Sequence, residues 1–302
     1  MIERYFHNKM TWLDVLNPTT EEIREIMEES EIPREYMNDL MSATPKTEIL
    51  YQKGAVKVKI DYPVVKRTDL SRPHEIKFLV TKNHLVTIRF EEIEALHRFG
   101  KEYEVICMLK GKQKMSTELL FLTMLNYLYE ALHEKLDYVE SKLKDIEEEV
   151  FKGHEREMVF ELSQISRRVI VFRQTISAHE DVLGRLSESM RVAFGNPHSA
   201  ACESLLNHFS AITRRVKALV SMQEYLHNTN NSLLSTKQNE IMKFLTVISF
   251  ITFPSMLMSS IFGMNTQHTP LIGEQHDFLV ITGSMLFLTV IILIYFKFKR
   301  WI

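Results

Sequence analysis

The sequence contains little cysteine, glycine or proline, and its charge is nearly balanced. Its 302 residues include 2 cysteines, 9 glycines and 8 prolines. Two isolated cysteines, Cys107 and Cys202, provide neither a disulfide framework nor a metal cluster, and they are typical of a reducing compartment. The net charge of −2 produces no overall positive field, so we expect no nucleic acid among the partners.

Motifs of the common enzyme classes are also absent from the sequence. We find no glycine-rich phosphate-binding loop, no HExxH zinc motif, no nucleophile elbow and no CxxC pair. The chain is therefore expected to be no enzyme, to hold no cofactor and to power no ATP-driven pump by itself. Residues Met1–His7 lack the apolar core of a cleaved signal peptide, so targeting to a membrane must come from later segments.

Two long uncharged segments near the C-terminal end are the most informative feature that is present. They are Phe244–Phe262 and Phe278–Phe296. Each contains about 19 residues, close to the ~20 needed to cross the hydrocarbon core of a bilayer. A pair of buried helices in a soluble domain is the alternative, but two such segments in succession are rare there. The sequence therefore predicts two transmembrane helices.

Basic residues flank these segments on one side of the expected membrane only. Lys237 and Lys243 precede the first segment and the basic tail 297–302 follows the second, whereas residues 263–277 contain no lysine or arginine. Because basic flanks are retained in the cytoplasm, we expect a multi-pass protein of the plasma or inner membrane with both termini in the cytoplasm.

The N-terminal third of the chain has the pattern of a mixed domain. Asn17–Thr20 reads as a turn and helix cap, and acidic residues follow in the first helical turn. Residues 47–61 and 75–90 contain the alternating β-branched residues of strands. We therefore expect an α/β domain over residues 1–110, within a fold of α+β class that continues into long helices and two C-terminal transmembrane helices.

Helical periodicity dominates the chain after residue 110. Residues 111–197 predict a helical hairpin, and its second helix is expected to extend from Glu155 to Phe194. A stalk helix over 198–262 follows and continues into the first transmembrane segment. It would be about 90 Å long at about 60 residues, and a helix of that length must pack on its neighbours or on copies of itself. The remaining expected segments are an extracytoplasmic loop (263–277), a second transmembrane helix (278–296) and a cytoplasmic tail (297–302).

One face of the first transmembrane segment is polar without being charged. Its members recur at spacings of three and four, which places them on one stripe of a helix. They are Asn239, Met242, Thr246, Ser249, Phe253, Met256 and Ser260. The stripe is explained either by a pore, or by lipid or helix contacts that include hydroxyls by chance.

The segment ends in an unusual place for polarity, with Gly263-Met264-Asn265 at its outer end. Here the sequence resembles the CorA magnesium-transporter family, whose signature is Gly-Met-Asn at this position. Residues 78–89 are similar to the family's central strand pair and residues 239–246 to its pore entry. Pro254 lies where members carry a proline that kinks the span.

The resemblance implies a funnel-shaped homopentamer surrounded by membrane lipids, with first spans around a pore and second spans outside them. The transported ion would be Mg²⁺, with Co²⁺ or Ni²⁺ as further divalent ions, and cytosolic Mg²⁺ would also regulate the pore. Pore-lining positions would be the stripe together with Leu245, and Met242, Leu245, Phe253 and Met256 would close the pore by excluding water. Gly263, Met264 and Asn265 would select the ion, with Asn265 as its binding residue.

The outer loop departs from the family's usual Met-Pro-Glu-Leu sequence. Glu274 and Asp277 are expected to attract cations there. His268 and His276 lie near the same mouth and are candidate zinc ligands. Two alternatives to magnesium transport remain open. One is a proton-coupled zinc transporter of the related ZntB branch, and the other is a membrane-anchored sensory or structural protein without flux.

Overall fold

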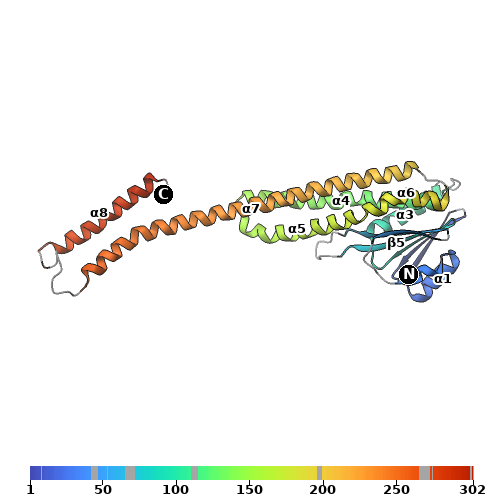
Figure 1. The fold of residues 1–302 in the computed structure, drawn as a ribbon, viewed down its shortest axis with the longest axis horizontal. Coiled ribbons are helices and arrows are strands. Elements are labelled where there is room, and N and C mark those ends of the chain that lie inside the picture. Colours follow the sequence, from blue (N-terminus) through green and yellow to red (C-terminus); the bar gives the residue numbers. More distant parts are fainter. Residues whose placement is uncertain are drawn as a thin grey trace. The chain divides into compact units, whose positions relative to one another are not determined.

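The structure is a computed structural model that describes residues 1–7, 9–41, 47–52, 54–64, 72–109, 115–195, 199–264, 273, 275–299 and 301. These residues form two compact units, Met1–His227 and Asn228–Ile302. The ribbon is shown in Figure 1. The finer division into domains at residues 110 and 197 stays a prediction.

A six-stranded sheet forms the base of the N-terminal unit. Its strands are β1 (Ile2–His7), β2 (Met10–Leu16), β3 (Glu48–Gln52), β4 (Ala55–Tyr62), β5 (His74–Val80) and β6 (His84–Arg89). The order across the sheet is β1-β2-β6-β5-β4-β3. Only β2 and β6 pair in parallel, and the other neighbours are antiparallel. The strands expected from 47–61 and 75–90 are confirmed, whereas β1 and β2 carry no prediction.

Short helices cover one face of this sheet. They are α1 (Thr20–Glu29), the 3-10 turn η1 (Arg34–Tyr36) and α2 (Met37–Met41). Thr19 caps α1: its side chain accepts a hydrogen bond from the Glu22 N–H at 3.2 Å, and Glu22 accepts one from the Thr19 N–H at 2.8 Å. The expected cap is therefore confirmed. Apolar side chains of α1 and α2 are buried against alternate residues of the strands, among them Leu13 and Val86.

Longer helices cover the opposite face, as Figure 1 shows. They are α3 (Glu94–Leu109) and α4 (Thr117–Phe151). The helix α3 is not predicted from the sequence. The rings of Phe78 and Phe121 meet edge to face at 5.2 Å between centroids. The Tyr62 hydroxyl donates to the Leu128 carbonyl at 3.1 Å. These contacts fix α4 across the central strands.

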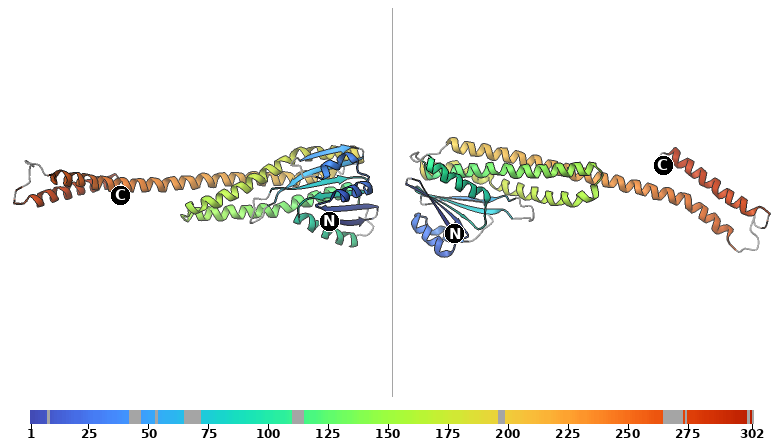
Figure 2. Two further views of the ribbon diagram at one scale, coloured as in Figure 1. Left: turned by 90° about the horizontal axis from the view of Figure 1, so that it is seen from below. Right: turned by 180° about the vertical axis from the view of Figure 1, so that it is seen from behind.

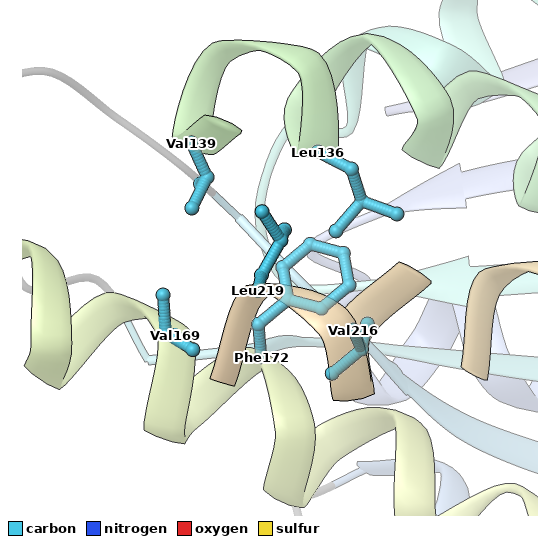
Figure 3. Close-up of a pocket in the computed structure, with 6 residues that line it drawn as sticks. All are labelled: Leu136, Val139, Val169, Phe172, Val216 and Leu219. Atoms are coloured by element: carbon cyan, nitrogen blue, oxygen red, sulfur yellow. The ribbon is translucent and has the colours of Figure 1, made fainter. Parts of the chain in front are cut away.

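Three helices continue side by side beyond the sheet, as Figures 1 and 2 show. They are α4, α5 (Glu155–Ala178) and the first part of α7 (Ser199–Phe262). Each contributes two apolar side chains to the small gap drawn in Figure 3, which is lined by Leu136, Val139, Val169, Phe172, Val216 and Leu219. This purely apolar contact supplies the neighbours that the long stalk helix needs for stability.

The expected single helix from Glu155 to Phe194 is wrong, because α5 ends at Ala178 and α6 (Glu180–Phe194) begins at Glu180. His179 lies at the break and is buried. Its Nε2 is 2.8 Å from the Asp61 carbonyl and its Nδ1 is 2.7 Å from the Tyr129 hydroxyl. Since a carbonyl only accepts, Nε2 carries the proton and Tyr129 donates to Nδ1. This anchoring to α4 and the end of β4 interrupts a helix that contains no proline at the break.

The second unit contains the remainder of α7 and α8 (Asp277–Phe298). Both helices are long and apolar enough to cross a membrane. The most apolar part of each helix is almost entirely uncovered by the rest of the chain, whereas the core helix of a soluble protein is mostly buried. The α7 helix is continuous over 64 residues, in agreement with the expected stalk that continues into the first span.

Candidate functional site

The candidate site follows the second half of α7, where the sequence predicts a pore. Its residues divide into two sets by exposure. Those covered wholly or partly are Val247, Ile251, Pro254, Ser255, Met258 and Phe262, along with Thr246. The exposed residues include Asn239, Met242, Leu245, Ser249, Phe253, Met256 and Ser260 of the predicted pore face, and also apolar residues on other sides of the helix, among them Phe244, Ile248 and Leu257.

Except for Thr246, a member of the stripe that is only partly covered, the covered residues lie on the face of α7 opposite the stripe. At about 100° of rotation per residue, the centre of the stripe lies about half a turn from the line through Val247, Ile251 and Met258. The covered line is the one that faces α8, since Ser255 lies on it and reaches Thr289 of that helix. The predicted pore residues therefore share one uncovered face, directed away from the neighbouring span of the same chain.

Hydroxyl groups on this face are arranged as hydrogen-bond acceptors. Thr246 donates to the Met242 carbonyl at 2.7 Å, and Ser249 donates to the Leu245 carbonyl at 2.9 Å. Because each hydroxyl has a single proton, its oxygen is left to accept from an outside donor. The water molecules around a hydrated cation are such donors, so this face suits a hydrated ion better than a bare one.

At its C-terminal end, which is expected to face outward, α7 stops at Phe262 and Gly263 follows. The Gly263 N–H donates to the Ser259 carbonyl at 2.9 Å, and a Cβ at this position would lie 3.0 Å from the same oxygen. Glycine therefore permits a closer turn than a larger residue would. Met264 is exposed beyond it. Asn265, the last residue of the motif, lies outside the described residues.

The outer loop is described only in part, and Glu274 and His268 lie outside that part. Asp277 is the first residue of α8, where its Oδ1 accepts from the Phe278 N–H at 2.6 Å and its Oδ2 from the Gly273 N–H at 3.2 Å. The carboxylate therefore holds the start of α8 as well as carrying charge. Its attraction of cations stays a prediction, and so does zinc binding by the exposed His276.

Two contacts between α7 and α8 escape sequence reasoning. The hydroxyls of Ser255 and Thr289 are 3.3 Å apart. The rings of Phe250 and Phe296 meet edge to face at 5.8 Å. Each residue belongs to a long uncharged segment, and the sequence contains no signal for which face of one span meets the other.

No group of three or more His, Cys, Asp or Glu side chains is placed to hold a metal ion among the residues that the structure describes. The stripe itself contains no such side chain. A site for the regulatory ion expected from the sequence stays a prediction.

Comparison with known proteins connects this geometry to a family. The profile of the family described as CorA-like Mg²⁺ transporter protein matches residues 7–300. A protein of Methanocaldococcus jannaschii named cobalt/magnesium transport protein CorA is 24% identical over 97% of this chain and 92% of its own length. A protein of the same name from Thermotoga maritima is 26% identical, over 63% of this chain and 54% of its own length.

Solved structures agree in fold. The complete CorA magnesium transporter structure from Methanocaldococcus jannaschii has a TM-score of 0.85 at 19% identity, covering 99% of this chain and 93% of that one. The ZntB cytoplasmic domain from Vibrio parahaemolyticus has a TM-score of 0.54 at 14% identity, covering 77% of this chain and 90% of that one. The likeness extends from the N-terminal α/β unit to both apolar C-terminal helices, and with the match over residues 7–300 it shows that the chain belongs to the CorA-like Mg²⁺ transporter family.

Proposed function

We propose that this protein carries Mg²⁺ into the cell through a pore made by copies of α7 in a homopentamer. The observation that carries the proposal is the uncharged polar stripe of α7, which is exposed opposite α8 and leads to Gly263-Met264-Asn265. Membership of the family and the names of the magnesium and cobalt transport relatives support the choice of ion. Co²⁺ and Ni²⁺ are expected to share the path.

The chemistry of the stripe suits this ion. Mg²⁺ is small, strongly hydrated and slow to lose water. Hydroxyl oxygens of Thr246 and Ser249 accept hydrogen bonds from the water around it without displacing that water. A ring of Asn265 amide oxygens would do the same at the outer mouth, and dipoles hold a cation weakly enough for it to leave.

Closure of the pore is assigned to the large apolar members of the exposed face. These are Met242, Leu245, Phe253 and Met256, which lie at four successive heights along the exposed face of α7. When these side chains approach one another across the pore, water is excluded and ions are stopped. Cytosolic Mg²⁺, bound between copies of the N-terminal unit, would favour this closed state.

The membrane potential supplies the driving force. Entry of positive charge toward a negative interior is favoured by about 2.3 kcal/mol per elementary charge per 100 mV. The expected orientation, with the N-terminal unit and the basic tail in the cytoplasm, is supported by the basic residues that precede the first span and follow the second.

Uptake into proteoliposomes that contain the purified protein tests the proposal. Mg²⁺, Co²⁺, Ni²⁺ and Zn²⁺ are each supplied outside, with and without a proton gradient, and protein-free liposomes serve as the control. We expect Mg²⁺ uptake that does not change with the proton gradient. Absence of uptake for every ion by an intact oligomer would favour the membrane-anchored protein without flux.

Proton-coupled zinc transport is the second candidate. The likeness to the ZntB cytoplasmic domain and the two histidines of the outer loop favour it. In the same assay it requires Zn²⁺ uptake that increases when a proton gradient is imposed. The family match, over nearly the whole chain, favours magnesium.

A further inference from the structure

The span of α7 contains one backbone position that has no hydrogen-bond donor. Pro254 lies in the interior of the helix. It has no N–H to offer the Phe250 carbonyl one turn earlier, and its ring crowds that carbonyl. A helix bends most easily at such a position. Any bend there changes the positions of Phe253 and Met256, which lie on either side of the proline on the exposed face.

The two contacts with α8 bracket this weak position. Phe250, whose carbonyl lacks the donor, packs its ring on Phe296 at 5.8 Å. Phe296 is buried and also contacts Trp301 at 5.7 Å. Ser255, directly after the proline, lies 3.3 Å from Thr289. The α8 helix therefore contacts α7 on both sides of the missing hydrogen bond.

The hydroxyl of Ser255 bonds to a residue of another helix, unlike the neighbouring hydroxyls of α7. Thr246, Ser249 and Thr252 each donate to the carbonyl four residues earlier in their own helix, at 2.7, 2.9 and 2.9 Å. Thr289 likewise donates to the Met285 carbonyl of α8 at 2.9 Å. Since the single proton of Thr289 is used there, Ser255 must be the donor of the bond that joins the two helices.

We propose that the Ser255–Thr289 hydrogen bond sets the bend of α7 at Pro254 and thereby the width of the pore at Phe253 and Met256. Both are positioning residues, because they face each other across the contact of α7 with α8 and lie away from the stripe. A bend that opens or closes the pore has to break this bond or separate Phe250 from Phe296. The proposal rests on the proposed transport function.

A double-mutant cycle tests the proposal. Ser255→Ala, Thr289→Val and the double variant are compared with the native protein for the initial rate of Mg²⁺ uptake. Thr252→Val is the matched control, since it removes a hydroxyl that bonds only within α7. One interhelical hydrogen bond in a membrane alters an equilibrium by about threefold. We expect each single variant to change the rate by about threefold in the same direction, the double variant to match them, and the control to equal the native rate.

A second readout does not depend on transport. In a background with Cys107 and Cys202 replaced by serine, Met256→Cys reports the environment of the exposed face through its rate of reaction with a water-soluble thiol reagent. Ser255→Ala and Thr289→Val are expected to change this rate equally, and Thr252→Val is expected to leave it unchanged.

The two readouts separate the possible failures. A native protein without Mg²⁺ uptake whose Met256→Cys reactivity still follows the cycle would refute the transport proposal and leave the helix contact supported. Additive effects of the two single variants, or an equal effect of Thr252→Val, would overturn the role of the Ser255–Thr289 bond. Unchanged uptake and reactivity in both single variants would overturn it as well.

Discussion

At the scale of single residues, His179 links pH to the folding of the N-terminal unit. Burial lowers the pKa of His179 from 6.5 to about 4. The unfolded chain therefore takes up a proton on this histidine below pH 6.5, whereas the folded chain takes it up only near pH 4. As the pH decreases from 6.5 to 4, the free energy of unfolding therefore decreases. The loss is about 2 kcal/mol at pH 5.

Replacement of His179 by glutamine is expected to remove this part of the pH dependence, because an amide can bond both Asp61 and Tyr129 without titrating. Thermal unfolding of the purified protein at pH 7 and pH 5 measures the difference. His97→Gln, at an exposed position, should retain the native pH dependence. Identical acid sensitivity of native protein and His179→Gln would contradict the assignment.

Arg89 is a second residue whose replacement is expected to change the stability of the fold. It forms a buried ion pair with Asp14, with Nη2 and Oδ2 2.8 Å apart, and Thr87 donates to the same carboxylate at 2.6 Å. Arg89→Met would leave the Asp14 charge buried without its partner, at a cost of about 3–5 kcal/mol. Arg98→Met breaks an exposed pair with Glu134 and is expected to cost less than about 1 kcal/mol. Denaturant unfolding compares the two, and equal losses would refute the difference.

At the scale of elements, the two faces of α7 are expected to react differently. Single cysteines at Met242, Ser249 and Met256 should react with a water-soluble thiol reagent in proteoliposomes, because these positions share the exposed stripe. Cysteines at Ile251 and Met258 should remain unreactive against α8. Reactivity that does not follow this helical period of 3.6 residues would show that the stripe does not line water.

The elements that the sequence predicts are those with a local physical signal. Alternating residues identify β3 to β6, and uncharged length identifies the two spans. The strand β2 pairs with β1 on one side and with the distant β6 on the other, as when Leu13 meets Val86, so part of its signal lies far along the chain. The break at His179 depends on partners in β4 and α4. Neither the strand β2 nor the break at His179 can be predicted from the neighbouring residues of the sequence alone.

The candidate site divides in the same way. Helical spacing alone places Ser249, Phe253 and Met256 on one face, and the structure confirms that they share it. The motif identifies Asn265 by resemblance, and its role stays a prediction. Ser255 and Thr289 escape detection because their contact depends on the rotation of α8 about its own axis, which a long uncharged sequence does not encode.

At the scale of the whole molecule, we propose that the exposed stripe faces copies of the same chain. In a single chain, Thr246 and Ser249 keep their hydrogen bonds within α7, but their oxygens would face lipid, which offers them no further donor. Copies of α7 around a common axis would turn this face toward water instead. Native mass spectrometry of the detergent-extracted protein is expected to give five times the 35.5 kDa mass of one chain. A monomer under conditions that retain uptake would contradict the assembly.

The transport path is tested most directly by Mg²⁺ uptake in Asn265→Ala, driven by an inside-negative potential in proteoliposomes. Gln275→Ala is the matched control, because it removes an amide from the same loop outside the motif. The account predicts that Asn265→Ala abolishes Mg²⁺ uptake while native protein and Gln275→Ala take up the ion at equal rates. Native uptake by an intact Asn265→Ala oligomer would contradict a path that runs through the Gly263-Met264-Asn265 mouth.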